Sequence, residues 1–433
     1  MGVLLLIVPV VLETVLLIIR IHTKSGQIKA RSVAHIVLAA LFALLLLTHF
    51  IGWSFRYYAL AAMFSLQALA GLVRLIRKKG EIKPFGSSRT IAKAIGKMAL
   101  LFLVSLPALL FPEHGIIPPT GKYQVAAAAY TFTDESRVET YNPSNQNRRL
   151  NVEFWYPENA AGKYPLIVFS HGAMGIRTSN VSLYHELASN GYVVCAIDHT
   201  YHCLYTTLDD GHTVYINADY MRQLQQEDAK ADKQQSFEYY QQWMKIRTGD
   251  INFVLDRILS TVGSENIDNV YGLIDETRIG VMGHSLGGSA TLGIGRTRKD
   301  VGAAIALESP FLCDITGIRD GEFVFNDEPY PVPVLNVYSD SSWSNLSRWP
   351  QYVQNSRLLY QNSADAPYVH ISGTGHFTLT DLALTSPLLT RMFNGFQTTA
   401  DAEYCLKIIN SVCLRFFDSY LKDKGSFAAS EIY

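Results

Sequence analysis

The pentapeptide Gly283-His284-Ser285-Leu286-Gly287 has the residue types and the spacing of a nucleophilic serine. An apolar run precedes it and small residues follow it, which indicates a strand, a sharp turn and then a helix. Such a turn strains the backbone of the serine and leaves no room for a side chain at either flanking glycine. It also places the hydroxyl at a helix N-terminus, where backbone N–H groups favour an oxyanion. The motif predicts covalent catalysis by Ser285, with the N–H of Leu286 as one oxyanion donor; the alternative is a tight turn whose serine caps a helix.

A nucleophilic serine needs a base, and His376 is the best placed of the 12 histidines. It follows Gly373-Thr374-Gly375 at the end of the last predicted strand, where a loop can bring an imidazole back to the hydroxyl. His199, His202 and Cys203 have a spacing that could hold a metal. We interpret them instead as a loop that crosses the sheet, and expect neither a metal nor an organic cofactor.

Two carboxylates are candidates for the acid that orients the histidine. Glu308 follows the predicted strand 301–307, and Asp340 follows the predicted strand 334–338. Asp340 lies near the position at which most enzymes with a serine, acid and histidine on a parallel sheet place their acid, whereas Glu308 comes one strand earlier. Each could also cap the helix that follows. The residues alone leave both acids open.

The elements around these residues alternate between strand and helix from about residue 123 onward. Apolar or alternating strands are predicted at 149–157, 164–169, 192–197, 278–282, 301–307, 334–338 and 367–371, and helices at 183–190, 250–259 and 400–421. Alternation predicts a mostly parallel sheet with helices on both faces, and functional residues beyond the carboxyl ends of the strands. The order serine, acid, histidine is that of the α/β-hydrolase triad. Residues 204–245, with a helix near 218–240, form a possible cap insertion or a solvated surface helix.

The first quarter of the chain has a different character, with four long apolar runs at about 3–19, 33–53, 57–76 and 94–111. About 20 apolar residues cross a bilayer as a helix, and the fourth run is marginal because it is shorter and contains Lys97. A signal peptide is disfavoured because no basic residues precede the first run and no small-residue cleavage site follows it. We predict an all-α transmembrane region of about four helices.

The distribution of basic residues predicts the orientation of this region. The link after the first run holds Arg20, Lys24, Lys29 and Arg31, and that after the third holds seven Lys or Arg residues; Arg56 alone lies between runs two and three. Because cytoplasmic loops carry the excess of Lys and Arg, the C-terminal domain should be extracytoplasmic. The net charge of −1 gives no basic footprint for nucleic acid.

About half of the chain resembles the bacterial relatives of platelet-activating factor acetylhydrolases, a branch of the α/β-hydrolases close to dienelactone-hydrolase-like esterases. The matching segments are VEFWYP at 152–157, FSHG at 169–172, LASNGY at 187–192, DINFVLD at 250–256 and VMGHSLGG at 281–288. The resemblance implies ester hydrolysis and makes the N–H of Ala173 the second oxyanion donor, with His171 as a structural residue of that turn. It also favours Glu308 over Asp340, although the family usually has Asp there.

Together these features predict a multi-pass cell-membrane protein with a transmembrane region at 1–115 and an α/β-hydrolase domain at 116–433. The predicted activity is that of a serine esterase with Ser285, His376 and Glu308, acting on small-molecule or lipid-like acyl esters. Two alternatives stay open: an acyltransferase on the same fold, and a binding or sensory module that has lost turnover.

Overall fold

The computed structural model describes residues 2–25, 27–77, 87–142, 145–264, 268–361, 367–427 and 430–433. The chain divides into two compact units, which we describe separately. One consists of Met1–Gly115 with Thr385–Leu389, and the other of Ile116–Leu384 with Thr390–Tyr433.

The described residues of the first unit include four long apolar helices, one over each predicted apolar run. They are α1 (Gly2–Thr23), α2 (Ile28–Leu47), α3 (Phe55–Ile76) and α4 (Ser87–Leu110). Each is long and apolar enough to cross a membrane by length and composition. At most 22% of the residues in their most apolar windows are buried, so most of this apolar surface faces outward.

A buried carboxylate links three of these helices. Glu13 of α1 is only 4% exposed, and its Oε1 lies 2.9 Å from Nε2 of His35 on α2 and 3.0 Å from Nζ of Lys97 on α4. Arg31 approaches the same carboxylate at 3.5 Å. Ionisable groups inside an apolar bundle are expected to face one another, and this cluster satisfies that expectation.

The second unit is built on a sheet whose described strands number nine. Its spatial order is β1 (Val125–Val138), β2 (Asn147–Pro157), β4 (Val193–Asp198), β3 (Tyr164–Ser170), β7 (Ile274–His284), β8 (Val301–Leu307), β11 (Val334–Ser339), β12 (Tyr368–Ile371) and β13 (Ser430–Ile432). The pairings β1–β2 and β2–β4 are antiparallel, and the others are parallel. The carboxyl ends of β3, β7, β8, β11 and β12 therefore lie along one edge of the sheet.

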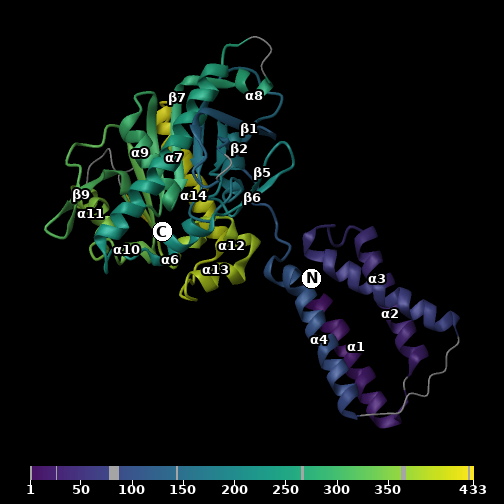
Figure 1. Cartoon of the computed structure of the whole chain (residues 1–433). Helices are drawn as coiled ribbons and strands as arrows, with labels where there is room; N and C mark the ends of the chain where they lie inside the picture. Colours follow the sequence, from purple (N-terminus) through teal and green to yellow (C-terminus); the bar gives the residue numbers. More distant parts are fainter. Residues whose placement is uncertain are drawn as a thin grey trace. The chain divides into compact units, whose positions relative to one another are not determined.

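Helices cover both faces of the sheet, because its central strands are apolar throughout and must be buried on both sides (Figure 1). Helices α7 (Lys233–Thr261) and α9 (Leu286–Thr297) contribute to one core layer. Helices α5 (Val181–Ser189) and α14 (Ala402–Leu421) contribute to the other. In α14 the buried Cys405, Ile409, Val412 and Phe416 recur every three or four residues, as one face of a helix requires.

Shorter elements connect these layers at the edges of the sheet and in the loops. They are α8 (Asn269–Gly272), β9 (Ile315–Arg319), β10 (Glu322–Phe325), α10 (Asp340–Trp343), α11 (Val353–Gln361), α12 (Leu382–Thr385) and α13 (Pro387–Phe393), with 3-10 turns at Leu312–Asp314, Pro350–Tyr352 and His376–Leu379.

The segment 204–245 differs in detail from the single helix expected there. It contains a small hairpin, β5 (Tyr205–Thr207) with β6 (Thr213–Tyr215), then α6 (Ala218–Gln226) and the first part of α7. Helix α7 continues through Gly249 instead of beginning near residue 250. A Cβ at Gly249 would lie 2.5 Å from Nη1 of Arg137, so this glycine permits a close approach and does not end the helix.

Candidate active site

Ser285 occupies a strained turn between β7 and α9. Its backbone angles are φ 55° and ψ −126°, a conformation that L-residues rarely adopt. A Cβ at Gly283 would lie 2.5 Å from the carbonyl carbon of Gly287, and one at Gly287 would lie 2.0 Å from the carbonyl oxygen of Ser170. Both flanking positions therefore require glycine, for the steric reason that the sequence pattern suggested.

The loop after β3 passes beside this turn. A Cβ at Gly172 would lie 3.2 Å from Cβ of Ser285, so the loop backbone is in near contact with the serine. In the described part of the chain, the backbone N–H groups of Ala173 and Leu286 have no hydrogen-bond acceptor. Leu286 is the first residue of α9, where N–H groups lack an intrahelical partner. Two free donors thus stand on the two segments that meet at Ser285.

His171 supports this loop from within. Its Nδ1 lies 2.6 Å from the carbonyl oxygen of Gly172, and its Nε2 accepts a hydrogen bond from the N–H of His199 at 3.3 Å. Burial, followed by the positive charge of Arg247, holds the pKa of His171 well below its ordinary value. The neutral ring therefore carries its proton on Nδ1 and donates it to Gly172, which fits the expected structural role.

His376 lies against the same turn. Its ring centroid is 4.6 Å from that of His284, the neighbour of Ser285, and Nε2 of His284 lies 3.0 Å from the carbonyl oxygen of His376. The His376 N–H donates to Oγ of Ser341 at 3.1 Å. Burial, and then the imidazole of His284, hold the pKa of His376 well below its ordinary value. Its imidazole makes no hydrogen bond to Ser285, to Glu308 or to any other residue that the structure describes.

Glu308 follows β8 and is 1% exposed, with a positive φ of 53°. Its carboxylate accepts hydrogen bonds from the N–H and Oγ of Ser339, at 2.5 and 2.8 Å. Burial raises the pKa of Glu308 to about 7, against the opposing effect of hydrogen bonds from Ser339 and Ser342. The preceding residue, Leu307, accepts the N–H of Ser285 at 2.9 Å, so Glu308 follows directly on the residue that holds the serine turn.

Asp340 occupies a different environment. Its side chain is 51% exposed, and its carboxylate contacts Nε2 of His370 at 2.7 Å and the N–H of Gly373 at 2.8 Å. Its own N–H donates to the carbonyl of Thr374 at 3.2 Å. Asp340 therefore holds the start of the loop that leads to His376.

The structure brings together a different group of possible metal ligands from the His199, His202 and Cys203 considered in the sequence. His171, Asp198 and Cys203 have possible ligand atoms within 4.8 Å of one another, and all three are buried. The carboxylate of Asp198, however, is bound by Nη1 of Arg177 at 2.6 Å and Oγ1 of Thr206 at 2.7 Å. Both nitrogens of His171 are also engaged, so the cluster offers no free ligand set.

A buried ionic network beneath the strand ends was missed by the sequence reasoning. Arg148 bridges Glu139 and Asp250, each at 2.6 Å, and Asp250 contacts Nδ1 of His199 at 2.9 Å. His199 in turn lies 2.8 Å from Oγ of Ser170, which leads into the loop beside Ser285. The partners come from four distant segments, and no local pattern connects them.

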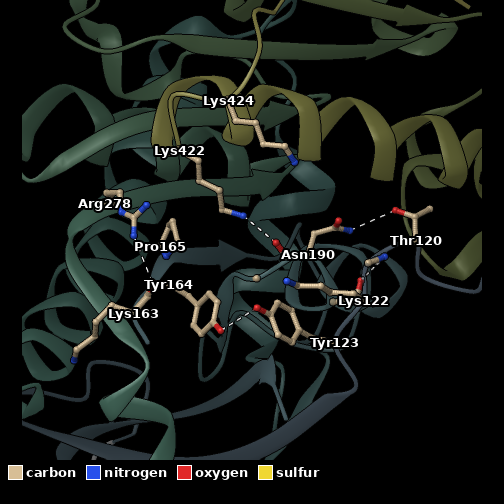
Figure 2. A pocket seen from close by; sticks show the side chains of 13 residues that line it. Thr120, Lys122, Tyr123, Lys163, Tyr164, Pro165, Asn190, Arg278, Lys422 and Lys424 are labelled. Carbon is tan, nitrogen blue, oxygen red and sulfur yellow. Dashed lines mark hydrogen bonds between the residues drawn. The ribbon is translucent and has the colours of Figure 1, made fainter. Parts of the chain in front are cut away.

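A separate pocket of about 540 Å³ lies at the opposite, amino-terminal edge of the sheet (Figure 2). Its basic lining residues are Lys122, Lys163, Arg278, Lys422 and Lys424. Three of these groups already have carboxylate partners: Lys422 and Lys424 pair with Asp418, and Arg278 pairs with Asp275. Ser285 follows the carboxyl end of β7, so this pocket is distinct from the candidate active site.

Comparisons with known proteins agree with this architecture. The family model described as "Platelet-activating factor acetylhydrolase, isoform II" matches residues 139–431. A ferulic acid esterase structure from Streptomyces cinnamoneus superposes with a TM-score of 0.55, at 22% identity, over 72% of this chain and 94% of that one. The predicted α/β-hydrolase fold is therefore confirmed.

Curated relatives extend the comparison. Platelet-activating factor acetylhydrolase of Cavia porcellus is 24% identical over 61% of this chain, and the chain spans 59% of that relative's length. A cutinase of Thermobifida fusca is 28% identical over 49% of this chain and 57% of its own length. The match of the family model over more than half of the residues confirms the resemblance seen in the sequence. The chain belongs to the platelet-activating factor acetylhydrolase, isoform II family.

Proposed function

We propose that the protein is a membrane-anchored serine hydrolase that cleaves carboxylic esters through an acyl-enzyme on Ser285. The observation that carries this proposal is the strained Ser285 turn, with the free N–H groups of Ala173 and Leu286 on the two segments beside it. Two such donors next to a serine hydroxyl form an oxyanion hole. The family membership of the chain supports the same chemistry.

In the acylation step, Oγ of Ser285 attacks the ester carbonyl while His376 takes its proton. The negative charge that develops on the carbonyl oxygen is stabilised by the N–H groups of Ala173 and Leu286. His376 then gives the proton to the departing alcohol, which leaves the acyl group on Ser285. In the second step, His376 takes a proton from the water that attacks the acyl carbonyl, and returns it to Oγ of Ser285 as the bond between the acyl group and Oγ breaks and the carboxylic acid departs.

Glu308 is the acid that we assign to His376. It is buried and accepts a hydrogen bond from Ser339 at the end of β11, and two residues later Ser341 of α10 accepts the backbone N–H of His376, so both residues are held by the same short segment. A buried carboxylate stabilises the imidazolium formed during proton transfer better than one that water screens. Asp340 is half exposed and already engaged with His370, which supports a role in anchoring the loop.

The substrate class that we propose is an acyl ester, either short-chain or lipid-like. The relatives are named as platelet-activating factor acetylhydrolases and cutinases, and both names denote hydrolases of acyl esters. We propose the segment 204–245 as a cap over the acyl or alcohol pocket. Its support is the hydrogen bond from the N–H of Leu204 to Gly175 at 3.1 Å, and the stacking of Tyr220 on His202 at 3.8 Å.

We also propose that α1–α4 anchor the protein in the cell membrane, with the catalytic domain outside the cytoplasm. The apolar outer surfaces of these helices and the excess of Lys and Arg in two of their links support this arrangement. Three of those basic residues, Lys78, Lys79 and Lys83, lie outside the described residues.

The experiment that tests the function is an ester panel graded by acyl length, assayed with the full chain in detergent and with Ser285→Ala. The wild type should hydrolyse the esters, and the variant should lose activity by roughly a million-fold while staying folded. Near-normal turnover by folded Ser285→Ala would overturn the assignment. Acyl transfer to added alcohols in preference to water would identify the acyltransferase alternative.

A further inference from the structure

Arg247 of α7 is a fully buried arginine without a carboxylate partner. It is 0% exposed, and in the described part of the chain its guanidinium forms no ion pair. Arg148, which is similarly buried, instead bridges two carboxylates. A buried charge without a counterion is unfavourable unless hydrogen bonds compensate it. The hydrogen-bond partners of Arg247 therefore indicate which part of the structure it stabilises.

Those partners are two consecutive carbonyl groups of the loop beside Ser285. Nη1 of Arg247 donates to the carbonyl oxygen of His171 at 2.5 Å, and Nη2 donates to that of Gly172 at 3.2 Å. Its Nε has no hydrogen-bond partner among the described residues, so the two carbonyl groups are its acceptors there, and the hydroxyl of Tyr220 is a further polar neighbour of the guanidinium.

The carbonyl of Gly172 belongs to the same peptide unit as the N–H of Ala173. This oxygen also receives hydrogen bonds from Nδ1 of His171 at 2.6 Å and from the N–H of Gly175 at 3.2 Å. In a trans peptide the C=O and the N–H point in opposite directions, so fixing one fixes the other. Three donors on one side of this peptide direct the Ala173 N–H to the other side.

The positive charge of Arg247 favours the same function as its hydrogen bonds, because it strengthens the Ala173 N–H as a donor. A cation at the carbonyl oxygen draws electron density from the amide and makes its N–H a stronger donor. The same charge also opposes protonation of His171, which must stay neutral because its Nε2 accepts from His199.

We propose that Arg247 is a positioning residue of the oxyanion hole, which orients and polarises the Gly172–Ala173 peptide so that the Ala173 N–H can stabilise the oxyanion. This inference rests on the proposed function, since it assigns Arg247 to the same site. It does not require Arg247 to touch the substrate.

The test compares full-length Arg247→Met, which removes the charge, with Arg247→Lys, which keeps the charge but not the paired donors. The matched control is Arg296→Met. Arg296 is also largely buried, with 12% of its side chain exposed, but it pairs with Asp314 at 2.7 Å and does not contact the loop. For each variant we would measure the unfolding midpoint, kcat, KM and the inhibition constant of a trifluoromethyl ketone, whose tetrahedral adduct places an oxyanion in the hole.

Arg247→Met should lower kcat by about 100-fold, the loss expected for one oxyanion donor, with KM changed only a few-fold. Affinity for the ketone should fall in parallel with kcat, and Arg247→Lys should lie between the wild type and Arg247→Met. Arg296→Met should lose stability but keep kcat and ketone affinity.

A folded Arg247 variant with normal kcat and ketone affinity would overturn the inference, as would a rise in KM alone. Failure of both Arg247 variants to fold would assign the residue to the core and overturn it as well. These results leave the proposed function intact, because the wild type remains active. If the wild type itself neither hydrolyses esters nor binds the ketone, the proposed function fails first.

Discussion

Within the proposed triad, the residue that titrates near neutral pH is the acid, Glu308. Burial raises the pKa of Glu308 to about 7, while burial and His284 keep the pKa of His376 well below its usual range. In the free enzyme the imidazole is therefore neutral and ready to accept a proton. Catalysis then requires Glu308 to be ionised, so kcat/KM should rise with pH through an apparent pKa of about 7.

Glu308→Gln should abolish this function and stabilise the fold. An amide cannot balance the imidazolium and can hold the wrong tautomer, so kcat should fall by about 10⁴-fold. The pKa of Glu308 in the folded protein lies above its ordinary value of 4.5, so ionising the buried carboxylate destabilises the fold. The wild type therefore loses stability as the pH rises from 4.5 through 7. At pH 8 the variant should be more stable than the wild type by about 3 kcal/mol, and near pH 4 the two should be similar. Activity assays with urea unfolding at both pH values measure this.

Asp340→Asn is the matched control for that experiment. It alters a half-exposed carboxylate that holds the loop before His376, so kcat should fall by no more than about tenfold, with no stabilisation at pH 8. If Asp340→Asn is crippled and Glu308→Gln turns over normally, Asp340 is the acid and the assignment drawn from the family resemblance is wrong.

The sequence could predict some of these residues because their signals are local. The glycines around Ser285 reflect contacts with backbone atoms of a neighbouring strand and helix, and those contacts impose a short motif. Arg247 carries no such signal, because it lies 75 residues from Gly172 in the sequence. Nothing in the sequence distinguishes it from other long polar side chains of an amphipathic helix. The network around Arg148, which reaches 102 residues to Asp250, was hidden for the same reason.

At the scale of elements, long and strongly patterned segments were predictable and short ones were not. The apolar strands β3, β8 and β11 and the helix α14 appear within a few residues of their expected positions. The hairpin of β5 and β6 has only three residues in each strand, so its conformation depends on tertiary pairing more than on pattern.

Helix α7 shows that one helix can be predicted as two. The sequence predicted separate helices near 218–240 and at 250–259, whereas the structure has one helix of 29 residues from Lys233 to Thr261. Gly249 lets the Arg137 guanidinium lie close against its turn of the helix. This continuity has a functional consequence, since the same helix carries residues of the proposed cap, Arg247 and Asp250 in a single rigid element.

At the scale of the whole molecule, the central prediction is topological. If α1–α4 each cross the membrane as we propose, the basic links after the first and third place the catalytic domain on the side away from the cytoplasm. A reporter that is active only in the cytoplasm, fused after Tyr433, should be inactive, and protease added to spheroplasts should digest the domain.

The control for this experiment is the same reporter fused within the link between α3 and α4, which should be active. A catalytic domain protected until the membrane is lysed, together with an active reporter at Tyr433, would contradict the orientation. Failure of α4 to insert would produce that result, because losing one span moves the C-terminal domain to the other side.

The measurement that tests the account most directly is mass spectrometry of the full chain after rapid acid quenching during turnover of an activated aryl ester. The account predicts one acyl group per chain, located on the peptide that contains Ser285 and absent from Ser285→Ala. It also predicts that a fluorophosphonate labels the same residue and blocks hydrolysis. Ester hydrolysis that persists in Ser285→Ala, or an acyl group found on a different residue, would contradict the account.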